Sequence, residues 1–374
     1  MRNPGFKLQA ASLELDPQRG GGVSLLTRSS LRLAACGLWL LAFSASAQRS
    51  PFNNLEVLPA DSNGHYRILI GGHFHGASSN RSGYPAATLL ANLDTINKLG
   101  ANLFLSTGDL FMDAEKDRPR YERAFFSKLR VPFFNAPGNH DLKGEESSEV
   151  PDQIELGKSM HDRAEVVVLD LESSDGSVSR KDLDRIEAFD PSSERLSHAT
   201  LLRRLFIISH RPIWAEDDPK YSKIFKDNTR SLTGTNFQRE VYPILLEIAK
   251  NAHIYWISGS LGGGAPSSIF FQEHAPNITY IQCAIRDEPR DALLIADVYP
   301  DSVHWSALSL TGQKLLAPQT YDAAWWRAQH GEGEGFNWRL LPYLGKLTVT
   351  SRAFWWGAAA TLLLVWLVRR LLRR

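Results

Sequence analysis

Four of five short motifs along this chain of 374 residues carry side chains that bind metal ions or transfer protons. The first four are Gly72-His73-Phe74-His75-Gly76, Gly108-Asp109, Gly138-Asn139-His140-Asp141 and Ser209-His210-Arg211-Pro212. Imidazole nitrogens and carboxylate or amide oxygens are donors that Mn, Zn and Fe accept. The fifth motif, Ser258-Gly259-Ser260-Leu261-Gly262, offers no good ligand. The set predicts a hydrolytic metal centre whose fifth motif does not supply a ligand.

Each motif directly follows a short apolar run of the kind that forms a buried strand. The runs are residues 67–70, 103–106, 131–136, 205–209 and 254–258. A strand fixes the root of the loop that follows it, while the loop leaves its side chains free to converge. We therefore expect one edge of a sheet to carry the whole site.

The motif series resembles the calcineurin-like metallophosphoesterase family. The usual order in that family is Asp-x-His, Gly-Asp-x-x-Asp/Asn, Gly-Asn-His-Asp/Glu, a single His, and Gly-His-x-His. The resemblance covers residues 67–310, and its specific part is Gly-Asn-His-Asp between an upstream Gly-Asp and a downstream Ser-His-Arg-Pro. It implies an α/β fold, the four-layer αββα metallophosphoesterase sandwich.

The resemblance also implies metal ligands. Asp109 would bridge two cations, Asn139 and His210 would bind the second metal, and His75 would bind the first. The implied cofactor is one or two divalent ions of Mn, Fe or Zn. Two metals about 3.5 to 4 Å apart would hold the phosphoryl oxygens and turn a bridging water into hydroxide.

Two further residues have catalytic roles by the same resemblance. His140 would be the general acid that protonates the leaving alkoxide. Asp141 would orient and charge the imidazole of His140.

The sequence departs from the family pattern at both metal positions. His73 stands where the family has Asp, and Ser260 and Gly262 stand where it has two histidines. Two sets of three candidate ligands remain: His73, His75 and Asp109, and Asp109, Asn139 and His210. Two histidines and one carboxylate are enough to hold a divalent ion, so the first set could still bind one.

Each residue type also has an ordinary structural role. Asp109 could cap a helix and Asn139 could form a turn. His253 and His274 could be recruited as ligands, although lone histidines are more often plain surface or core residues. The loop 258–264 could be a connector or a backbone nest for an anion, and we favour the connector.

Both ends of the chain predict export and membrane attachment. Residues 1–47 form an N-terminal extension and signal segment, in which Arg28 and Arg32 precede an apolar stretch and small residues precede Gln48. Residues 353–368 are free of charge and predict a transmembrane helix, and the arginine-rich residues 369–374 predict a cytoplasmic tail. Sixteen residues at 1.5 Å each span only about 24 Å, so arginine side chains would have to snorkel. The predicted protein is therefore single-pass in the cell membrane, with its domain extracytoplasmic (periplasmic).

Between these ends the pattern alternates between strands and helices. Apolar spacing predicts helices over 85–99, 181–189 and 236–249, and further strands over 166–171, 278–284, 292–298 and 303–308. We assign residues 65–310 to the phosphoesterase domain and 311–352 to a juxtamembrane linker. The linker tryptophans, Trp325, Trp326 and Trp338, either pack on the domain or lie on the membrane surface. Cys283 has no expected intrachain partner, because Cys36 falls in the signal segment.

The sequence leads to one function and one alternative. A membrane-anchored, extracytoplasmic, metal-dependent hydrolase would act on phosphate mono- or diesters, and its membrane location makes lipid-linked or envelope-glycan phosphates candidate substrates. The alternative is a catalytically impaired binding or scaffold protein that kept the fold, for which Ser260 and Gly262 are the evidence. A net charge of +1 argues against a nucleic-acid partner, since binding the phosphate backbone needs a concentrated positive surface.

Overall fold

In a computed structural model of the chain, the described residues are 48–141, 153–156, 163–172, 174–189, 202–225, 234–262, 264–329 and 348–373. The predicted signal segment and Trp338 lie outside these ranges.

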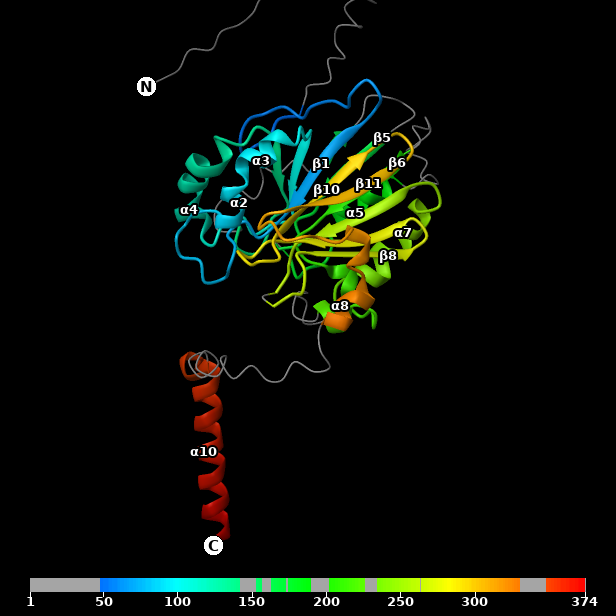
Figure 1. Cartoon of the computed structure of the whole chain (residues 1–374). Coiled ribbons are helices and arrows are strands. Elements are labelled where there is room, and N and C mark those ends of the chain that lie inside the picture. The colour runs from blue at the N-terminus through cyan, green and yellow to red at the C-terminus, as the bar shows by residue number, and fades with distance from the viewer. Residues whose placement is uncertain are drawn as a thin grey trace, which may run out of the picture. The chain divides into compact units, whose positions relative to one another are not determined.

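Two mixed β-sheets form the centre of the described chain (Figure 1). The first sheet has the order β11 (Val303–Ser309), β10 (Ala292–Val298), β1 (Tyr66–Gly71), β2 (Leu103–Ser106) and β3 (Phe133–Asn135). The second has the order β4 (Gln153–Leu156), β5 (Arg163–Val168), β6 (Leu202–Ile208), β7 (His253–Ser258), β9 (Ile278–Cys283) and β8 (Ile269–Ala275).

The strands that precede the five motifs pair in parallel with one another within each sheet. In the first sheet β1, β2 and β3 pair in parallel, and in the second β6 pairs in parallel with β7. The carboxyl ends of parallel strands meet at one edge of a sheet, which brings the following loops together. The site is therefore built from two sheets, whereas we expected a single sheet edge to carry it.

A shared hydrophobic core joins the two sheets. Ile68 and Ile70 of β1 belong to the same buried cluster as Phe206 and Ile208 of β6. Leu69, between the first two, points to the opposite face and belongs to a second cluster. This alternation is the period of two expected of a strand. The first sheet is thus buried on both faces, which explains why β1 and β2 are apolar runs without alternation.

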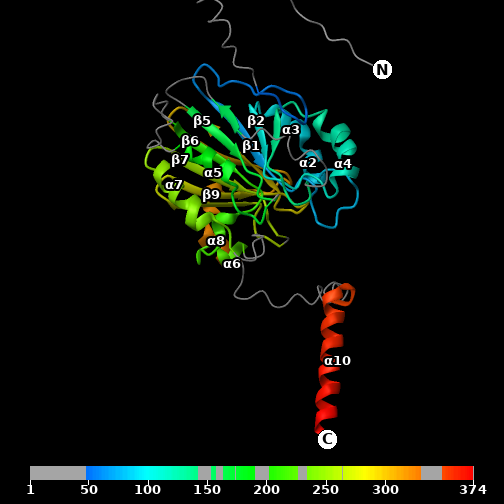
Figure 2. The ribbon, with the colours of Figure 1, turned by 180° about the vertical axis from the view of Figure 1, so that it is seen from behind.

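Helices α2 (Ala87–Ala91), α3 (Leu93–Lys98) and α4 (Ala114–Tyr121) lie beside the first sheet, and α5 (Arg180–Glu187) and α7 (Tyr242–Ile248) beside the second (Figure 2). Buried Leu89 and Ile96 of α2 and α3 join Leu69 in the second cluster. The predicted helix 85–99 is broken at Asn92, whose side-chain amide donates to the carbonyls of Thr88 and Leu310, each at 2.8 Å. A side chain that bonds the backbone in this way competes with helical hydrogen bonding.

Two further differences have local causes. The predicted helix 236–249 begins with a π-helical turn, Phe237–Val241, and becomes α-helical only at Tyr242–Ile248, where Pro243 has no amide proton for a continuous ladder. Helix α4 was not expected, because it is strongly polar and contains Pro119, so its sequence has no apolar period.

Part of the predicted linker packs on the domain. Helix α8 (Ala323–Gln329) buries Trp326, whose indole donates to the carbonyl of Ile269 at 3.1 Å and whose ring meets Phe225 and Phe270. Of the two placements that the sequence left open, Trp326 takes the one on the domain.

Helix α10 (Arg352–Leu372) is the one described helix long and apolar enough to cross a membrane. Its 21 residues extend about 32 Å at 1.5 Å per residue, close to the thickness of a bilayer core of about 30 Å. It exceeds the predicted 353–368 because the helix continues through Arg369 and Arg370. The guanidinium of Arg370 lies 5.3 Å from the centre of the Trp366 ring.

The ends of β2 and β7, from different sheets, approach each other closely at a glycine. A Cβ on Gly259 would meet Thr107, with the Thr107 carbonyl oxygen at 2.5 Å, whereas a Cβ on Gly262 in the same loop would meet nothing within 4 Å. Thr107 is itself fixed, because its hydroxyl donates to the Cys283 carbonyl at 2.9 Å. The sheets therefore meet where only glycine fits.

We predict that Gly259→Ala lowers the free energy of unfolding by about 1 to 3 kcal/mol, the usual cost of overpacking. Gly262→Ala is the matched control and should be within about 0.5 kcal/mol of the wild type. Urea unfolding of both variants gives the comparison. Equal stability of the two variants would contradict the close contact at Gly259.

Candidate metal centre

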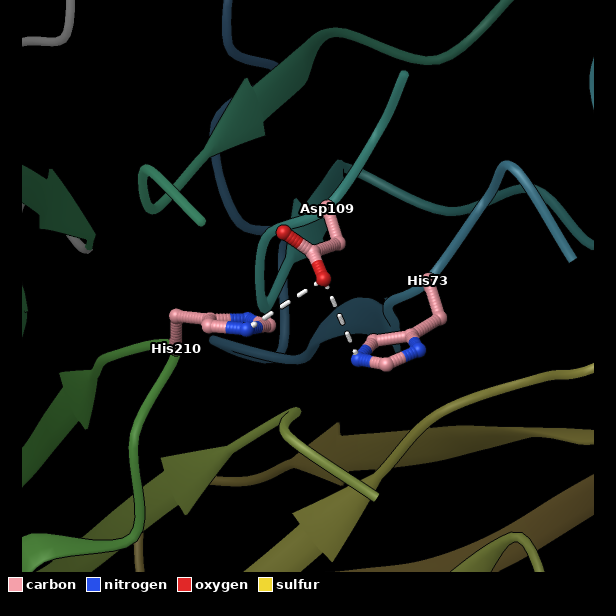
Figure 3. A group of neighbouring side chains, drawn as sticks. All are labelled: His73, Asp109 and His210. Atoms are coloured by element: carbon pink, nitrogen blue, oxygen red, sulfur yellow. Dashed lines mark ion pairs between the residues drawn. The ribbon is translucent and has the colours of Figure 1, made fainter. Parts of the chain in front are cut away.

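The centre is arranged around one carboxylate oxygen. Asp109 directly follows Gly108 at the end of β2, and its Oδ2 faces the Nε2 atoms of His210 at 3.4 Å, His73 at 3.5 Å and His75 at 3.7 Å (Figure 3 shows the first two). These distances are too long for good hydrogen bonds. They agree with the separation of about 3.3 Å between two ligands that each lie about 2.0 to 2.1 Å from one tetrahedral ion.

The four side chains are buried, with exposed fractions of 5% or less. Within the described part of the chain, Nε2 of His73, both ring nitrogens of His75 and Nε2 of His210 have no hydrogen-bond partner. Each buried polar atom left without a partner costs about 1 to 3 kcal/mol. Nitrogens converging on a carboxylate in this way fit a divalent metal ion, which would satisfy several of them at once.

The backbone of both the first and second motifs is held in an unusual conformation. His73 and Asp109 have φ angles of 54° and 57°, the left-handed region that side chains other than glycine seldom adopt. The amide of His73 donates to the Gly108 carbonyl at 2.8 Å, so the two turns support each other. This strained pair points both side chains into the same space.

Two histidines show the hydrogen-bond pattern typical of metal ligands. A ligating histidine usually donates its other N–H to a carbonyl or carboxylate. Nδ1 of His210 lies 2.9 Å from the Thr107 carbonyl and Nδ1 of His140 lies 3.2 Å from the Met112 carbonyl. A carbonyl only accepts, so each Nδ1 carries a proton and each Nε2 keeps its lone pair.

The structure groups the candidate ligands differently from the sequence. Two clusters could each hold an ion: His73, Asp109 and His210, and His75, Asp109 and His140. Asp109 belongs to both, as a bridging carboxylate would. His140, for which we expected only an acid role, lies within the second cluster. The ligand and acid roles of these residues remain predictions.

Asn139 is engaged by an arginine. Its side-chain oxygen, the expected metal ligand, accepts from Nη2 of Arg211 at 2.8 Å. Arg211 also donates through Nε to the buried carboxylate of Glu172 at 2.5 Å. We did not identify Glu172 in the sequence, although it directly follows the predicted strand 166–171, in whose place the structure has β5 at Arg163–Val168.

Asp141 has a different role from the one we expected. Its carboxylate accepts from the amides of Asp109 and Gly138, each at 2.9 Å, and from that of Leu110 at 2.9 Å. The amide of Phe111 and the side chain of Asn135 add two more bonds. Both oxygens are used in this way, and the His140 ring is oriented by the Met112 carbonyl. Asp141 therefore shapes the Asp109 loop, while the expected pairing with the His140 imidazole does not occur.

Electrostatics favour the metal-binding forms of the central groups. Burial alone would raise the pKa of Asp109, but His210, His75 and His73 outweigh it and hold the pKa well below its ordinary value. Burial lowers the pKa of His73 well below its ordinary value, so the ring is neutral near pH 7. Burial and the charge of Asp109 raise the pKa of Asp141. An ionised carboxylate is ready to bind a cation, because no proton has to be displaced from it.

The two additional histidines are not part of the centre. Nε2 of His253 bonds the hydroxyl of Thr279 at 3.0 Å, and Nδ1 of His274 bonds the hydroxyl of Tyr221 at 2.8 Å. Neither belongs to a candidate metal cluster among the described residues. They take the structural roles that we considered more common for lone histidines.

The fifth motif supports His210 through its backbone. The amides of Gly259 and Ser260 donate to the His210 carbonyl at 3.0 and 2.8 Å. These two amides are therefore not available to an anion, which agrees with a connector rather than a nest.

Residues 66–239 match the family described as calcineurin-like phosphoesterase. The matched phosphoesterase segment includes the first four motifs and ends before the fifth, where Ser260 and Gly262 stand.

The chain is also similar to solved structures. A dimetal phosphatase from Danio rerio has 14% identity and a TM-score of 0.47, with 68% of this chain and 98% of that chain covered. Vacuolar protein sorting 29 from Cryptosporidium parvum has 11% identity and a TM-score of 0.29, with 66% and 98% covered. Vps29 from Chaetomium thermophilum has 9% identity and a TM-score of 0.28, with 65% and 94% covered. Comparison with curated proteins finds no match.

We predict that Asp141→Asn destabilises this phosphoesterase segment by about 1 to 3 kcal/mol, because an asparagine amide group cannot accept from the N–H donors that the lost oxygen served. Asp301→Asn, at an exposed turn, is the control and should leave stability unchanged. Thermal unfolding measures both. A variant of wild-type stability with a lower hydrolytic rate would instead support the orienting role for Asp141.

Proposed function

We propose that the protein is a membrane-anchored hydrolase of phosphate mono- or diesters that depends on a divalent metal ion. The observation that carries the proposal is the convergence of three histidine Nε2 atoms on one buried carboxylate oxygen of Asp109. The match to the calcineurin-like phosphoesterase family supports the same chemistry. The fold we infer is the four-layer αββα arrangement, for which the core shared by the two sheets is the support.

The candidate ligands are Asp109, His75 and His210, with His73 and Asn139 as the remaining members of the expected sets. A bound Mn, Fe or Zn ion would supply Lewis acidity toward the phosphoryl group and a nucleophilic water. The protein itself fixes the carboxylate through the Asp109 loop and excludes water from the buried imidazoles.

His140 is the histidine of the centre best suited to proton transfer. Its side chain is partly exposed, whereas His73, His75 and His210 are buried. Its Nδ1 donates to the Met112 carbonyl, so Nε2 is the nitrogen that can take up a proton and pass it to a leaving alkoxide. We therefore assign the general-acid role to His140, without the help expected from Asp141.

A second candidate function is that of a binding or scaffold protein with impaired catalysis. The bond from Arg211 to the Asn139 side-chain oxygen favours it, because that atom is the one a second metal would need. Ser260 and Gly262, which lack ligand nitrogens, point the same way.

Metal content decides between the two functions. We expect the purified wild-type chain to bind at least one equivalent of Mn, Fe or Zn and to hydrolyse a phosphate mono- or diester, with chelation abolishing hydrolysis. Asp109→Asn should lose the metal, because it removes the one carboxylate shared by both clusters. Elemental mass spectrometry measures metal content, and Asp301→Asn is the control. Wild-type protein that binds no metal after reconstitution would leave the binding or scaffold role.

The anchoring part of the proposal rests on α10. The helix is long enough to span a bilayer, is entered through exposed Trp355 and Trp356, and has Arg369 and Arg370 in its last turn. Positive charge of this kind favours the cytoplasmic side, which would place the domain outside the cytoplasm. Phosphoesters of lipid-linked or envelope-glycan substrates would then be near the site.

Labelling of single cysteines tests this orientation. We expect a membrane-impermeant maleimide to label Asp301→Cys in intact cells and Arg373→Cys only after the membrane is opened, since the two positions lie on opposite sides of α10. Background from Cys283 should be small, because its thiol is buried. The reverse pattern would place the domain in the cytoplasm.

A further inference from the structure

Arg286 lies against the first motif although it belongs to none of the five. It follows β9, and the amide of the preceding Ile285 donates to the Gly72 carbonyl at 3.0 Å. The Arg286 amide donates to the Asp291 carboxylate at 2.9 Å. These two backbone bonds fix the root of the Arg286 side chain beside His73.

The Arg286 side chain determines where the His73 ring carries its proton. Nη1 of Arg286 lies 2.9 Å from Nδ1 of His73. Arginine has only N–H donors, so Nδ1 must be the acceptor. An imidazole whose Nδ1 accepts carries its proton on Nε2. The Nε2 of His73 that faces Asp109 is therefore an N–H group.

An N–H nitrogen has no lone pair for a metal ion. His73 is thus directed at Asp109 as a donor rather than as a ligand (Figure 3). His210 shows the opposite arrangement, because its Nδ1 donates to the Thr107 carbonyl and its Nε2 lone pair faces Asp109. The rings of His73 and His210 lie at similar distances from Oδ2 of Asp109, but only the Nε2 of His210 has a lone pair that can bind a metal ion.

Arg286 also brings a positive charge that no carboxylate cancels directly. Among the described residues, no Asp or Glu forms an ion pair with its guanidinium, and its buried Nε has no hydrogen-bond partner. Neighbouring Arg290 differs, because Glu288 pairs with it at 2.7 Å. The Arg286 charge therefore acts toward the His73 side of the centre, where a first cation would add further positive charge.

We propose that Arg286 takes His73 out of the ligand set and substitutes for the cation of the first position, so that the centre binds a single divalent ion. Asp109 holds that ion, with the other ligands drawn from the histidines other than His73. Arg286 is a positioning residue, since it acts through the His73 ring. The inference rests on the proposed function only in assuming that the centre binds metal.

The test counts zinc ions bound per full-length chain in detergent. Metal-free wild type, His73→Gln, Arg286→Met and Arg290→Met are dialysed against Zn²⁺ and analysed by elemental mass spectrometry, and competition with a chelating dye gives each Kd. Arg290→Met is the matched control, because Arg290 bonds the Ser267 carbonyl and Glu288 instead of a histidine.

We expect one equivalent in the wild type and the same number in His73→Gln, with Kd changed less than threefold. Arg286→Met should bind a second equivalent or bind at least tenfold more tightly, and adding His73→Gln to it should reverse the gain. Arg290→Met should match the wild type. A tenfold or larger loss of affinity in a folded His73→Gln, or an Arg286→Met that matches the wild type, would overturn the proposal.

Two outcomes separate this inference from the proposed function. If only Arg286→Met binds zinc, the proposed hydrolase fails while the role of Arg286 stands. If no form binds zinc, both fail. If Arg286→Met does not fold, nitrogen NMR of the histidines in the metal-free wild type shows which ring nitrogen of His73 carries the proton. We expect the proton on Nε2, and a proton on Nδ1 would exclude the proposal.

Discussion

Oδ2 of Asp109 is the atom on which the arrangement of the centre depends. Three imidazoles lie within 3.7 Å of it, two from the first sheet and one from the second. The loop that presents it has a left-handed backbone at Asp109. The carboxylate of Asp141 holds this loop by accepting from the amides of Asp109, Leu110 and Gly138. The fold therefore concentrates unusual backbone geometry and buried polar atoms at one point, as metal-binding and catalytic sites often do.

Two arginines limit which donors a metal ion can use. Arg211 donates to the oxygen of Asn139 and is itself paired with Glu172, so it competes for that oxygen without adding net charge. Arg286 fixes the His73 ring and adds a charge with which no Asp or Glu of the described residues forms an ion pair. Both act on residues that the family resemblance assigns to the metals. The site therefore differs from the family pattern at more positions than Ser260 and Gly262. The chemistry that we propose uses one ion.

Thr107 connects the two sheets at the centre. Its carbonyl accepts from His210, its hydroxyl donates to the Cys283 carbonyl, and its backbone allows only glycine at position 259. A shift of one sheet against the other would move His210 away from Asp109. Stability of the core and geometry of the site are thus coupled, since the same contact serves both.

The sequence alone predicted the resemblance to calcineurin-like phosphoesterases, the strands before each motif and most of the residues that meet at the centre, because apolar runs and motif spacing are local properties. An apolar helix at residues 353–368 was also predicted, from composition, and the structure extends it to residues 352–372. Tertiary structure decided that two sheets build the site, that Asp141 binds amides instead of the His140 ring, and that Arg211 and Arg286 engage Asn139 and His73. The bonds from Leu110 to Asp141, from Arg211 to Asn139 and from Arg286 to His73 join residues 31, 72 and 213 positions apart, and no local pattern encodes which polar atoms meet across such distances. A hydrogen bond depends on the direction in which each side chain points, and packing sets that direction only when the chain has folded.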